Sequence, residues 1–186
     1  MPSCSTWRST GSSACPPPRR RAERHTAMSA VVSVRLARPA DARAIAGMSR
    51  ELIETGLPWR WRPQRVLAAI ADPQTSVAVA ELQGELAAFG IMEFLDDDAY
   101  LSLLAVRSAR QRQGLGSALL GWLEASARAA GARRIRLETR RDNAAARSFY
   151  NELGFHEVGI RRGRYGAGVD GLLLEKWLQV SRAPSD

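Results

Sequence analysis

Cysteine is almost missing from this 186-residue chain, because only Cys4 and Cys15 occur and both stand near the N-terminus. The rest of the sequence therefore excludes a disulfide framework, a cysteine metal site and a catalytic thiol. The only histidines, His25 and His156, are too few for a histidine metal site, so we expect no bound metal. A chain without structural disulfides suits a reducing compartment, and we expect the protein to be cytoplasmic.

Lysine and long apolar runs are also scarce. Of the 27 basic side chains only Lys176 is a lysine, and such a skew reflects codon bias as much as selection for charge. The net charge of +8 is therefore weak support for nucleic-acid binding, and the aromatic and basic surface signatures of RNA-binding modules are missing. No apolar run approaches the roughly 18 residues of a membrane-spanning helix. We expect neither a membrane nor a specific nucleic-acid partner.

Composition divides the chain into three parts. Residues 1–28 are rich in serine, proline and arginine, and we expect disorder because they hold little to bury. They contain no apolar segment typical of a secretory signal, so we expect an extension without a structural role, and whether Met28 is the true start stays open. A basic arm for an acidic partner is the weaker alternative. Residues 29–180 are predicted to form one domain, followed by a tail at 181–186.

Hydrophobic periodicity predicts an alternation of strands and helices in this domain. Strands are expected near residues 31–36, 76–82, 86–95, 100–106, 134–139, 155–161 and 171–177. Helices are expected near residues 41–56, 63–70, 117–130 and 143–152, the first capped by Asp41 and the last starting at Asn143. A turn is expected at Gln83–Gly84, and a solvated turn at residues 96–98. This order predicts an α/β domain with a mixed sheet and helices on both faces.

The most informative segment is Gln111-Arg112-Gln113-Gly114-Leu115-Gly116, between an apolar strand and an amphipathic helix. A strand that turns into a helix through closely spaced glycines presents free N–H groups at the positive end of the helix dipole. Such a turn suits a phosphate or pyrophosphate, because a Cβ would hold the group away from the backbone. The dinucleotide fingerprint and the P-loop are both absent. An ordinary glycine-bearing turn is the alternative interpretation.

A second motif runs through residues 136–155: a strand, Asn143, a helix carrying Phe149-Tyr150, and then Gly154-Phe155. Together with the Q-x-x-G-x-G loop upstream, it resembles the GNAT superfamily of N-acetyltransferases, over about residues 31–178. The resemblance implies a GNAT-type mixed, mostly antiparallel central sheet. Within the superfamily the chain looks most like the ribosomal-protein alanine N-acetyltransferases. Three stretches support that likeness, namely residues 104–106 with 112–117, residues 137–143, and residues 154–170, whereas residues 56–75 depart from it on the acceptor side.

The resemblance implies acetyl-CoA as the co-substrate. The residues expected to contact coenzyme A are Leu104, Ala105, Val106, Gln111, Arg112, Gln113, Gly114, Leu115, Gly116, Ser117 and Asn143. Residues 112–117 would hold the pyrophosphate, and the strand edge at 104–106 would bind the peptide-like pantetheine arm and supply an oxyanion donor. Residues 104–106 are alternatively simple core strand, and both roles are compatible. The Arg112 side chain either adds a charge-assisted contact or is solvated, and Asn143 can cap its helix as well.

Two residues are expected to act in catalysis. Glu138 is the candidate general base, directly or through water, because superfamily members place their base at this position; a solvated strand end is the alternative. Tyr150 is the candidate general acid that returns a proton to the coenzyme A thiolate. A tyrosine pKa of about 10 matches a thiol pKa of about 8.5 only approximately, so orientation is as much its role as proton transfer. Core packing beside Phe149 is the alternative for Tyr150.

Further side chains have two interpretations each. Trp59 and Trp61 are either anchors for an acceptor peptide or core and lid packing, of which packing is favoured. The acidic residues 96–98 either attract a cationic amine or form only a solvated turn. The arginines 161, 162 and 164 are interpreted as solvated surface or, with Tyr165, as the entrance for the acceptor.

The combined expectation is an acetyl-CoA-dependent N-acetyltransferase that transfers acetyl directly to a primary amine. A protein N-terminus is the first choice, because an α-amine of pKa about 7.7–8.0 is partly neutral at pH 7, whereas a lysine of pKa about 10.4 is not. Alternatives are a small-molecule amine (an aminoglycoside, polyamine or amino-acid derivative), a non-catalytic acyl-CoA-binding module, and a nucleic-acid binder based on the arginine-rich N-terminus. The acyl-chain preference and the oligomeric state are not determined, and a homodimer stays open.

Overall fold

The computed structural model describes residues 32–166 and 168–178, so the expectations for residues 1–28 and 181–186 lie outside the described part. The strands are β1 (Val32–Leu36), β2 (Thr75–Leu82), β3 (Glu85–Leu95), β4 (Asp98–Val106), β5 (Arg134–Arg140), β6 (His156–Arg161) and β7 (Gly171–Trp177). The helices are α1 (Ala42–Leu52), α2 (Pro63–Ala71), α3 (Leu115–Ala129) and α4 (Ala144–Glu152), with short 3-10 turns at Pro39–Asp41 and Ser108–Arg110. The predicted order of strands and longer helices is confirmed.

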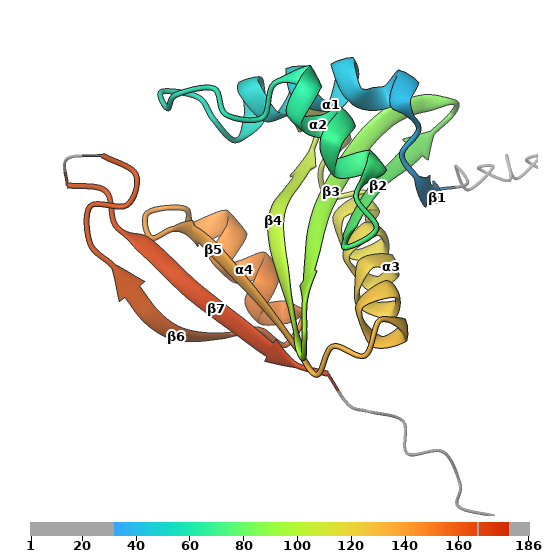
Figure 1. Cartoon of the computed structure of the whole chain (residues 1–186). Coiled ribbons are helices and arrows are strands. Elements are labelled where there is room, and N and C mark those ends of the chain that lie inside the picture. Colours follow the sequence, from blue (N-terminus) through green and yellow to red (C-terminus); the bar gives the residue numbers. More distant parts are fainter. Residues whose placement is uncertain (1–31, 167, 179–186) are drawn as a thin grey trace, which may run out of the picture.

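The seven described strands form one sheet in the order β1-β2-β3-β4-β5-β7-β6 (Figure 1). Only β4 and β5 run parallel, and every other neighbouring pair is antiparallel. The predicted mixed, mostly antiparallel sheet is therefore confirmed. The predicted turn between β2 and β3 has φ values of 55° at Gln83 and 80° at Gly84. Positive φ at both central residues is what a two-residue hairpin with right-handed strand twist requires.

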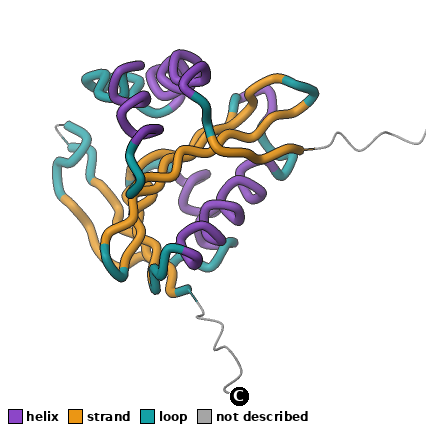
Figure 2. The backbone as a smooth tube through the Cα atoms, turned by 45° about the vertical axis from the view of Figure 1, so that its right-hand side comes forward, coloured by secondary structure: helices purple, strands orange, loops and turns teal. Residues whose placement is uncertain are grey.

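Helices cover both faces of the sheet, as predicted (Figure 2). The helices α1 and α2 pack on one face, where Ile45, Met48 and Val66 meet strand residues such as Phe89. The other face carries α3 and α4. It holds the larger set of buried side chains, which includes Leu115, Leu119, Leu120, Leu123, Ala127, Tyr150 and Phe155. The sheet therefore separates two hydrophobic cores.

A bulge in β4 changes which face its side chains enter. Met92 of β3 pairs with Leu101, and the preceding Ile91 pairs with Leu103, so Ser102 is an extra residue. Because strand side chains alternate between faces, one extra residue reverses the alternation beyond it. Leu101 accordingly packs with the α3 core, whereas Leu103 packs with the α1 and α2 core.

The parallel strands β4 and β5 pair only over a short length. Their register runs from Asp98 opposite Arg134 to Leu101 opposite Leu137. Beyond it, β4 stays paired with β3 as far as Val106, while β5 stays paired with β7. The two halves of the sheet diverge from this point, as Figure 1 shows. Among the described residues, the edge of β4 that faces β5 is thus left without a strand partner over residues 102–106.

Two sequence expectations at the element ends are wrong. Asp98 does not belong to a solvated turn but begins β4, because its carboxylate accepts two hydrogen bonds from Arg134, at 3.0 and 2.8 Å. These bonds hold the pKa of Asp98 below its ordinary value and fasten the start of the β4–β5 pair. The Asp41 side chain makes no cap bond to α1. It accepts instead from the Arg38 N–H and pairs with Arg35, each at 2.7 Å, which closes the 3-10 turn before the helix.

Candidate active site

The loop between β4 and α3 presents unpaired backbone donors. Gly114, the residue before the helix, has φ 80°, and no side chain caps α3. The first intrahelical bond runs from the Ala118 N–H to the Gly114 carbonyl, at 2.9 Å, so the N–H groups of residues 114–117 have no intrahelical acceptor. The first turn carries no acidic side chain. The start of α3 is therefore chemically suited to a phosphate-bearing ligand.

Packing brings this helix start close to α4 and to the end of β4. A Cβ at Gly116 would lie 3.2 Å from two ring carbons of Phe149 and 3.5 Å from the Val106 Cγ2. The glutamine side chains of the motif fold back onto the loop rather than outward. Gln111 donates to the Val106 carbonyl at 3.3 Å, and Gln113 donates to the Ala109 carbonyl at 3.4 Å. The loop is held by its own side chains, which leaves its backbone available for a ligand.

The strand residues expected beside coenzyme A lie along the free edge of β4. Ala105 is buried in the α1 and α2 core, while Leu104 and Val106 pack against the α3 core. Their side chains therefore serve the two cores, as the core-strand alternative requires. The backbone on the β5 side has no strand partner within the described residues, so binding of an extended, amide-containing arm there is compatible with the packing.

Glu138 lies on β5 just past the last residue that pairs with β4, and its side chain is only 4% exposed. Neither carboxylate oxygen has a hydrogen-bond partner among the described residues. Arg164 Nε and Arg161 Nη1 approach these oxygens at 3.1 and 3.5 Å but are not oriented to donate. Gly171 on β7 leaves the necessary room, because a Cβ there would overlap the carboxylate. The site therefore holds a buried carboxylate with unused acceptor capacity.

Two tyrosines experience the negative charge of Glu138. Burial raises the pKa of Tyr165 to about 12, with Glu138 adding to the shift and Arg164 opposing it. Burial likewise raises the pKa of Tyr100, again with Glu138 adding to it. Sequence analysis missed Tyr100 as a site residue. Its position on the strand next to the candidate base could be found only once the parallel pairing of β4 with β5 was known.

Tyr150 is buried on α4, with its ring fixed by two aromatic neighbours. The ring lies edge-on to Phe149 at 5.1 Å and to Phe155 at 5.5 Å, measured between ring centroids. Burial raises the pKa of Tyr150 above the ordinary tyrosine value, and Tyr165 contributes to the shift. The hydroxyl therefore stays protonated at every ordinary assay pH. The core-packing interpretation holds for the ring, and a hydrogen-bonding role for the hydroxyl is compatible with it.

Asn143 caps α4, as predicted, because its Oδ1 accepts a hydrogen bond from the Ala146 N–H at 3.0 Å. The same residue lines a cleft of about 450 Å³ in the region where the sheet divides. The cleft walls come from the end of α1 and the following connection, from β4, from the end of β5 and from the β6–β7 loop. The lining residues are Leu52, Ile53, Thr55, Leu104, Arg140, Asp142, Asn143 and Tyr165.

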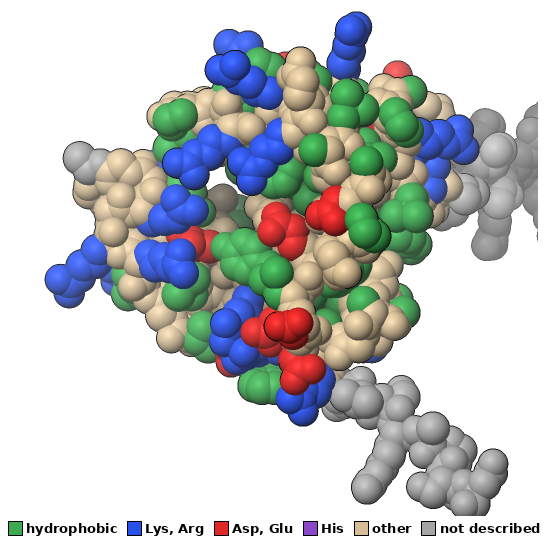
Figure 3. All heavy atoms as spheres, viewed as in Figure 1, with side chains coloured by type: hydrophobic (Ala, Val, Ile, Leu, Met, Phe, Trp, Pro, Cys, Tyr) green, Lys and Arg blue, Asp and Glu red, His purple; other side chains and the backbone are tan. Residues whose placement is uncertain are grey.

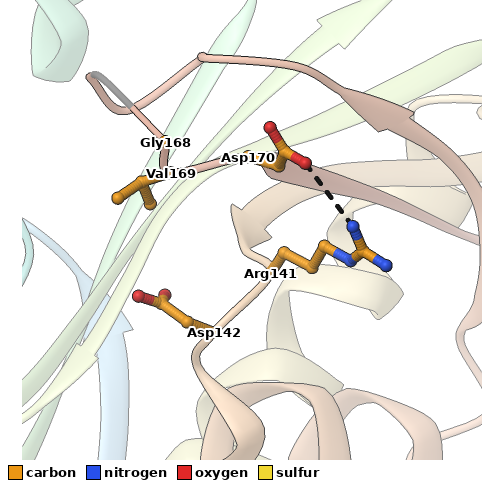
Figure 4. Close-up of a pocket in the computed structure, with 5 residues that line it drawn as sticks. All are labelled: Arg141, Asp142, Gly168, Val169 and Asp170. Atoms are coloured by element: carbon orange, nitrogen blue, oxygen red, sulfur yellow. Dashed lines mark hydrogen bonds and ion pairs between the residues drawn. The ribbon is translucent and has the colours of Figure 1, made fainter.

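A smaller hollow of about 210 Å³ lies beside this cleft and shares Asp142 with it (Figure 4). Here Asp170 joins the β6–β7 loop to the β5–α4 turn. Its carboxylate lies 3.5 Å from Arg141 and accepts the Gly163 N–H at 3.0 Å, while its carbonyl accepts the Arg141 N–H at 2.9 Å. These contacts hold in place the loop that carries Arg164 and Tyr165 toward Glu138.

The connection between α1 and α2 is organised by a buried acid that sequence analysis also missed. Glu54 is 7% exposed and accepts the N–H groups of Arg60 and Trp61, at 2.7 and 3.2 Å, and the Ser49 hydroxyl at 3.0 Å. Trp61 is buried in the α1 and α2 core, and the Trp59 Nε1 donates to the Trp61 carbonyl at 3.1 Å. The favoured packing interpretation of Trp61 is thus confirmed. Glu54 gives no sequence signal, because glutamate is common at helix ends.

Within the described part of the chain, no group of three or more His, Cys, Asp or Glu residues is arranged to hold a metal ion. In the same residues, no helix is both long and apolar enough to cross a membrane.

Comparison with known proteins places this geometry in a family. Residues 46–155 match the model of the acetyltransferase (GNAT) family. This chain belongs to the GNAT family. The family predicted from the two motifs is therefore confirmed.

Curated relatives of this GNAT protein are named [ribosomal protein bS18]-alanine N-acetyltransferases. The Escherichia coli K12 protein is 45% identical over 82 residues, which cover 44% of this chain and 55% of that protein. The Salmonella typhimurium protein is 36% identical over 126 residues, covering 61% of this chain and 84% of the relative. The match to the E. coli relative thus spans only about half of that protein's length.

Solved structures show the same fold. The ribosomal-protein-S18-alanine N-acetyltransferase from Escherichia coli superimposes with a TM-score of 0.70 at 27% identity, covering 84% of this chain and 99% of that one. PaiA N-acetyltransferase from Thermoplasma acidophilum, solved in complex with coenzyme A, superimposes with a TM-score of 0.68 at 20% identity, covering 80% of this chain and 99% of that one. The second likeness concerns the fold alone.

Proposed function

We propose that this GNAT protein transfers acetyl from acetyl-CoA directly to the α-amine of a protein N-terminus. The observation that carries the proposal is the Glu138 carboxylate, which is buried without a hydrogen-bond partner beside the cleft where β4 and β5 part. A buried carboxylate without donors is costly, and such groups concentrate at functional sites. An acceptor amine that reaches Glu138 would supply the missing donor.

The donor would bind along the helix start and the strand edge. Unpaired N–H groups at residues 114–117 suit the pyrophosphate of coenzyme A, and the Arg112 guanidinium lies in the same loop. The pantetheine arm contains amide groups, which match the free backbone groups of β4 over residues 102–106. Asn143 lines the cleft and would lie near the thioester end. Two proteins with the same fold were solved with coenzyme A and with acetyl-CoA, which supports this donor.

The proposed chemistry is a direct transfer. The lone pair of the neutral amine attacks the thioester carbonyl carbon, and Glu138 takes the proton that the nitrogen loses as the N–C bond forms, directly or through water. Negative charge develops on the carbonyl oxygen and is stabilised by a backbone N–H of β4. The tetrahedral intermediate then collapses, the C–S bond breaks, and the thiolate leaves. The Tyr150 hydroxyl donates a hydrogen bond to the sulfur, a role that its raised pKa favours over full proton transfer.

A protein α-amine is the acceptor best supported. The relatives are named for an alanine of a ribosomal protein, and a partly neutral α-amine needs less help from a single carboxylate than a lysine does. A small-molecule amine is the runner-up, because the α1–α2 connection that borders the cleft departs from the ribosomal-protein subfamily. A cytoplasmic location, a homodimer and the absence of a specific nucleic-acid partner stay predictions.

The decisive experiment measures thiol release from acetyl-CoA with a panel of N-terminal peptides, Nα-blocked lysine peptides, polyamines and aminoglycosides. We expect turnover with free N-terminal peptides. Glu138→Gln should lower kcat by about 10²–10⁴-fold, the range for loss of a general base, with coenzyme A affinity unchanged by calorimetry. The matched control is Glu152→Gln, an exposed acid at the end of α4, which should leave kcat unchanged.

Two other outcomes would contradict the proposal. Acetyl-CoA binding without turnover of any amine would indicate the non-catalytic module. Turnover confined to a polyamine or aminoglycoside would keep the enzyme but replace its acceptor class.

A further inference from the structure

The positive charge of the described residues is concentrated around the cleft. Three segments, residues 50–65, 138–142 and 161–170, each contribute residues to its lining, and together they hold nine arginines and five acidic residues. All other described residues hold twelve basic and twelve acidic side chains. The net charge of the described part therefore lies on the segments that surround the site.

One side of the cleft is formed by the connection from α1 to α2. Arg50, Arg60 and Arg62 are exposed there, and none of them has a carboxylate within ion-pair distance among the described residues. The nearby Glu54 makes no ion pair with them among the described residues, because its carboxylate is buried and accepts backbone N–H groups. The Trp59 ring holds two of these guanidinium groups, those of Arg50 at 5.2 Å and Arg62 at 5.8 Å. Such stacking orders an arginine while leaving its N–H edges free.

The opposite side is formed by the end of β6 and the loop that follows it. Arg161 and Arg164 reach into the site, where they lie at ion-pair distance from Glu138. Arg164 and Arg140 lie on the Tyr165 ring, at 5.9 and 6.0 Å from its centroid. In Figure 3, basic side chains stand above and to the left of the hollow between α1–α2 and the β6–β7 loop. Of the two sequence interpretations, the acceptor entrance therefore fits Arg161 and Arg164 better than a purely solvated surface does.

These two groups of arginines form what we call the arginine rim, with members Arg50, Arg60, Arg62, Arg161 and Arg164. We propose that the arginine rim selects acceptors whose amine is followed by acidic side chains, namely protein N-termini with Asp or Glu within their first few residues. The inference rests on the proposed function, because it places the acceptor amine at Glu138. Arginine binds carboxylates with paired N–H donors, whereas basic acceptor residues would be repelled on both sides.

The test compares three peptides that share an N-terminal alanine and differ in the next two residues: glutamate, glutamine or lysine. The readout is kcat/KM for thiol release from acetyl-CoA. We expect the glutamate peptide to exceed the glutamine peptide by about tenfold, as two exposed arginine–carboxylate pairs allow, with the lysine peptide lowest. Added salt should shrink the preference, because these charges are exposed.

The variant Arg60→Gln/Arg62→Gln should lower kcat/KM for the glutamate peptide to nearly that of the glutamine peptide. Its matched control is Arg43→Gln, an exposed arginine of α1 outside the rim, which should leave the preference unchanged. Equal rates for the three peptides, or a preference for lysine, would overturn the arginine rim and leave the proposed function intact.

If no peptide is turned over, the proposed function fails. Equilibrium binding then tests separately whether the arginine rim selects acidic peptides. Fluorescence anisotropy with labelled, Nα-acetylated versions of the peptides, in the presence of coenzyme A, gives that readout. Tighter binding of the glutamate peptide that the double variant abolishes would support the rim. Equal affinities for the three peptides would refute the arginine rim. It would also be refuted if a short RNA bound through the same arginines while the three peptides showed no difference in affinity.

Discussion

The Glu138 carboxylate is kept buried by residues that surround it without bonding to it. Gly171 provides the space, and two arginines supply positive charge at ion-pair distance without hydrogen bonds. Burying a carboxylate without hydrogen-bond donors has a cost in free energy even where charges of opposite sign lie nearby, so the arrangement favours any partner that brings a donor. In the proposed function, the acceptor amine is that donor.

At the same scale, Tyr150 offers a test of the leaving-group role. The change Tyr150→Phe keeps the ring that packs against Phe149 and Phe155 and removes only the hydroxyl. We expect kcat to fall by about 10–100-fold, with the melting temperature changed by no more than a few degrees. Steady-state kinetics and thermal unfolding measure the two effects. An unchanged kcat would assign Tyr150 to core packing alone.

Among the elements, the first turn of α3 joins the donor site to the packing of α4. Gly116→Ala would push a Cβ against the Phe149 ring, and we expect a loss of about 1–3 kcal/mol of stability together with weaker coenzyme A binding. Gly121 lies in the same helix, and a Cβ added there would have no neighbouring atom within 4 Å, so Gly121→Ala is the matched control. It should stabilise by about 0.5–1 kcal/mol and leave binding unchanged. Equal effects of the two changes, by denaturation and calorimetry, would refute the contact.

The α1–α2 connection is a second element whose shape depends on one side chain. In Glu54→Gln, one accepting oxygen becomes an amide donor that faces a backbone N–H. We expect a loss of about 1–3 kcal/mol of stability and a raised KM for the acceptor, with the KM for acetyl-CoA unchanged. The KM values measured separately for the two substrates provide the check. A change in both would show that the connection does not act on the acceptor alone.

For the whole molecule, the tyrosines determine how stability responds to alkali. All three tyrosines of the chain have a raised pKa, chiefly through burial, and that of Tyr165 is about 12. Below pH about 10 the hydroxyls are protonated in both the folded and the unfolded chain, so stability does not depend on them. Above it the unfolded chain ionises first, and stability is lost as the pH rises toward the folded pKa.

We therefore expect the thermal unfolding midpoint to fall between about pH 10 and 11.5, and to fall less steeply in Tyr165→Phe than in the parent protein. Unfolding followed by circular dichroism across this range measures both slopes. Identical slopes for the parent and the variant would contradict the linkage.

Those features of the fold and the site that depend on residues close together in the sequence could be predicted. The glycines of the α3 loop, the Asn143 cap and the Gln83–Gly84 turn each satisfy a backbone need within a few residues. The contacts of Asp98 and Asp41 could not be predicted in this way. Strand pairing brings Arg134 to Asp98, and the pairing of Asp41 with Arg35 competes with the expected helix cap. Tyr100 and Glu54 were missed for the same reason, since only their surroundings distinguish them.

Periodicity and turn chemistry in the sequence alone thus determined the order of the elements and the anion-suited helix start, while the resemblance of two motifs to the GNAT superfamily indicated the family and Glu138 as the candidate base. Tertiary structure decided where β4 and β5 part, because the register of a parallel pair depends on residues far apart in the chain. It also decided that side-chain alternation in β4 reverses at Ser102 and that Glu138 is buried against Gly171. Each of these depends on pairing with a neighbouring strand. The arginines gather around the cleft for the same reason: folding brings together charges that the linear sequence holds apart.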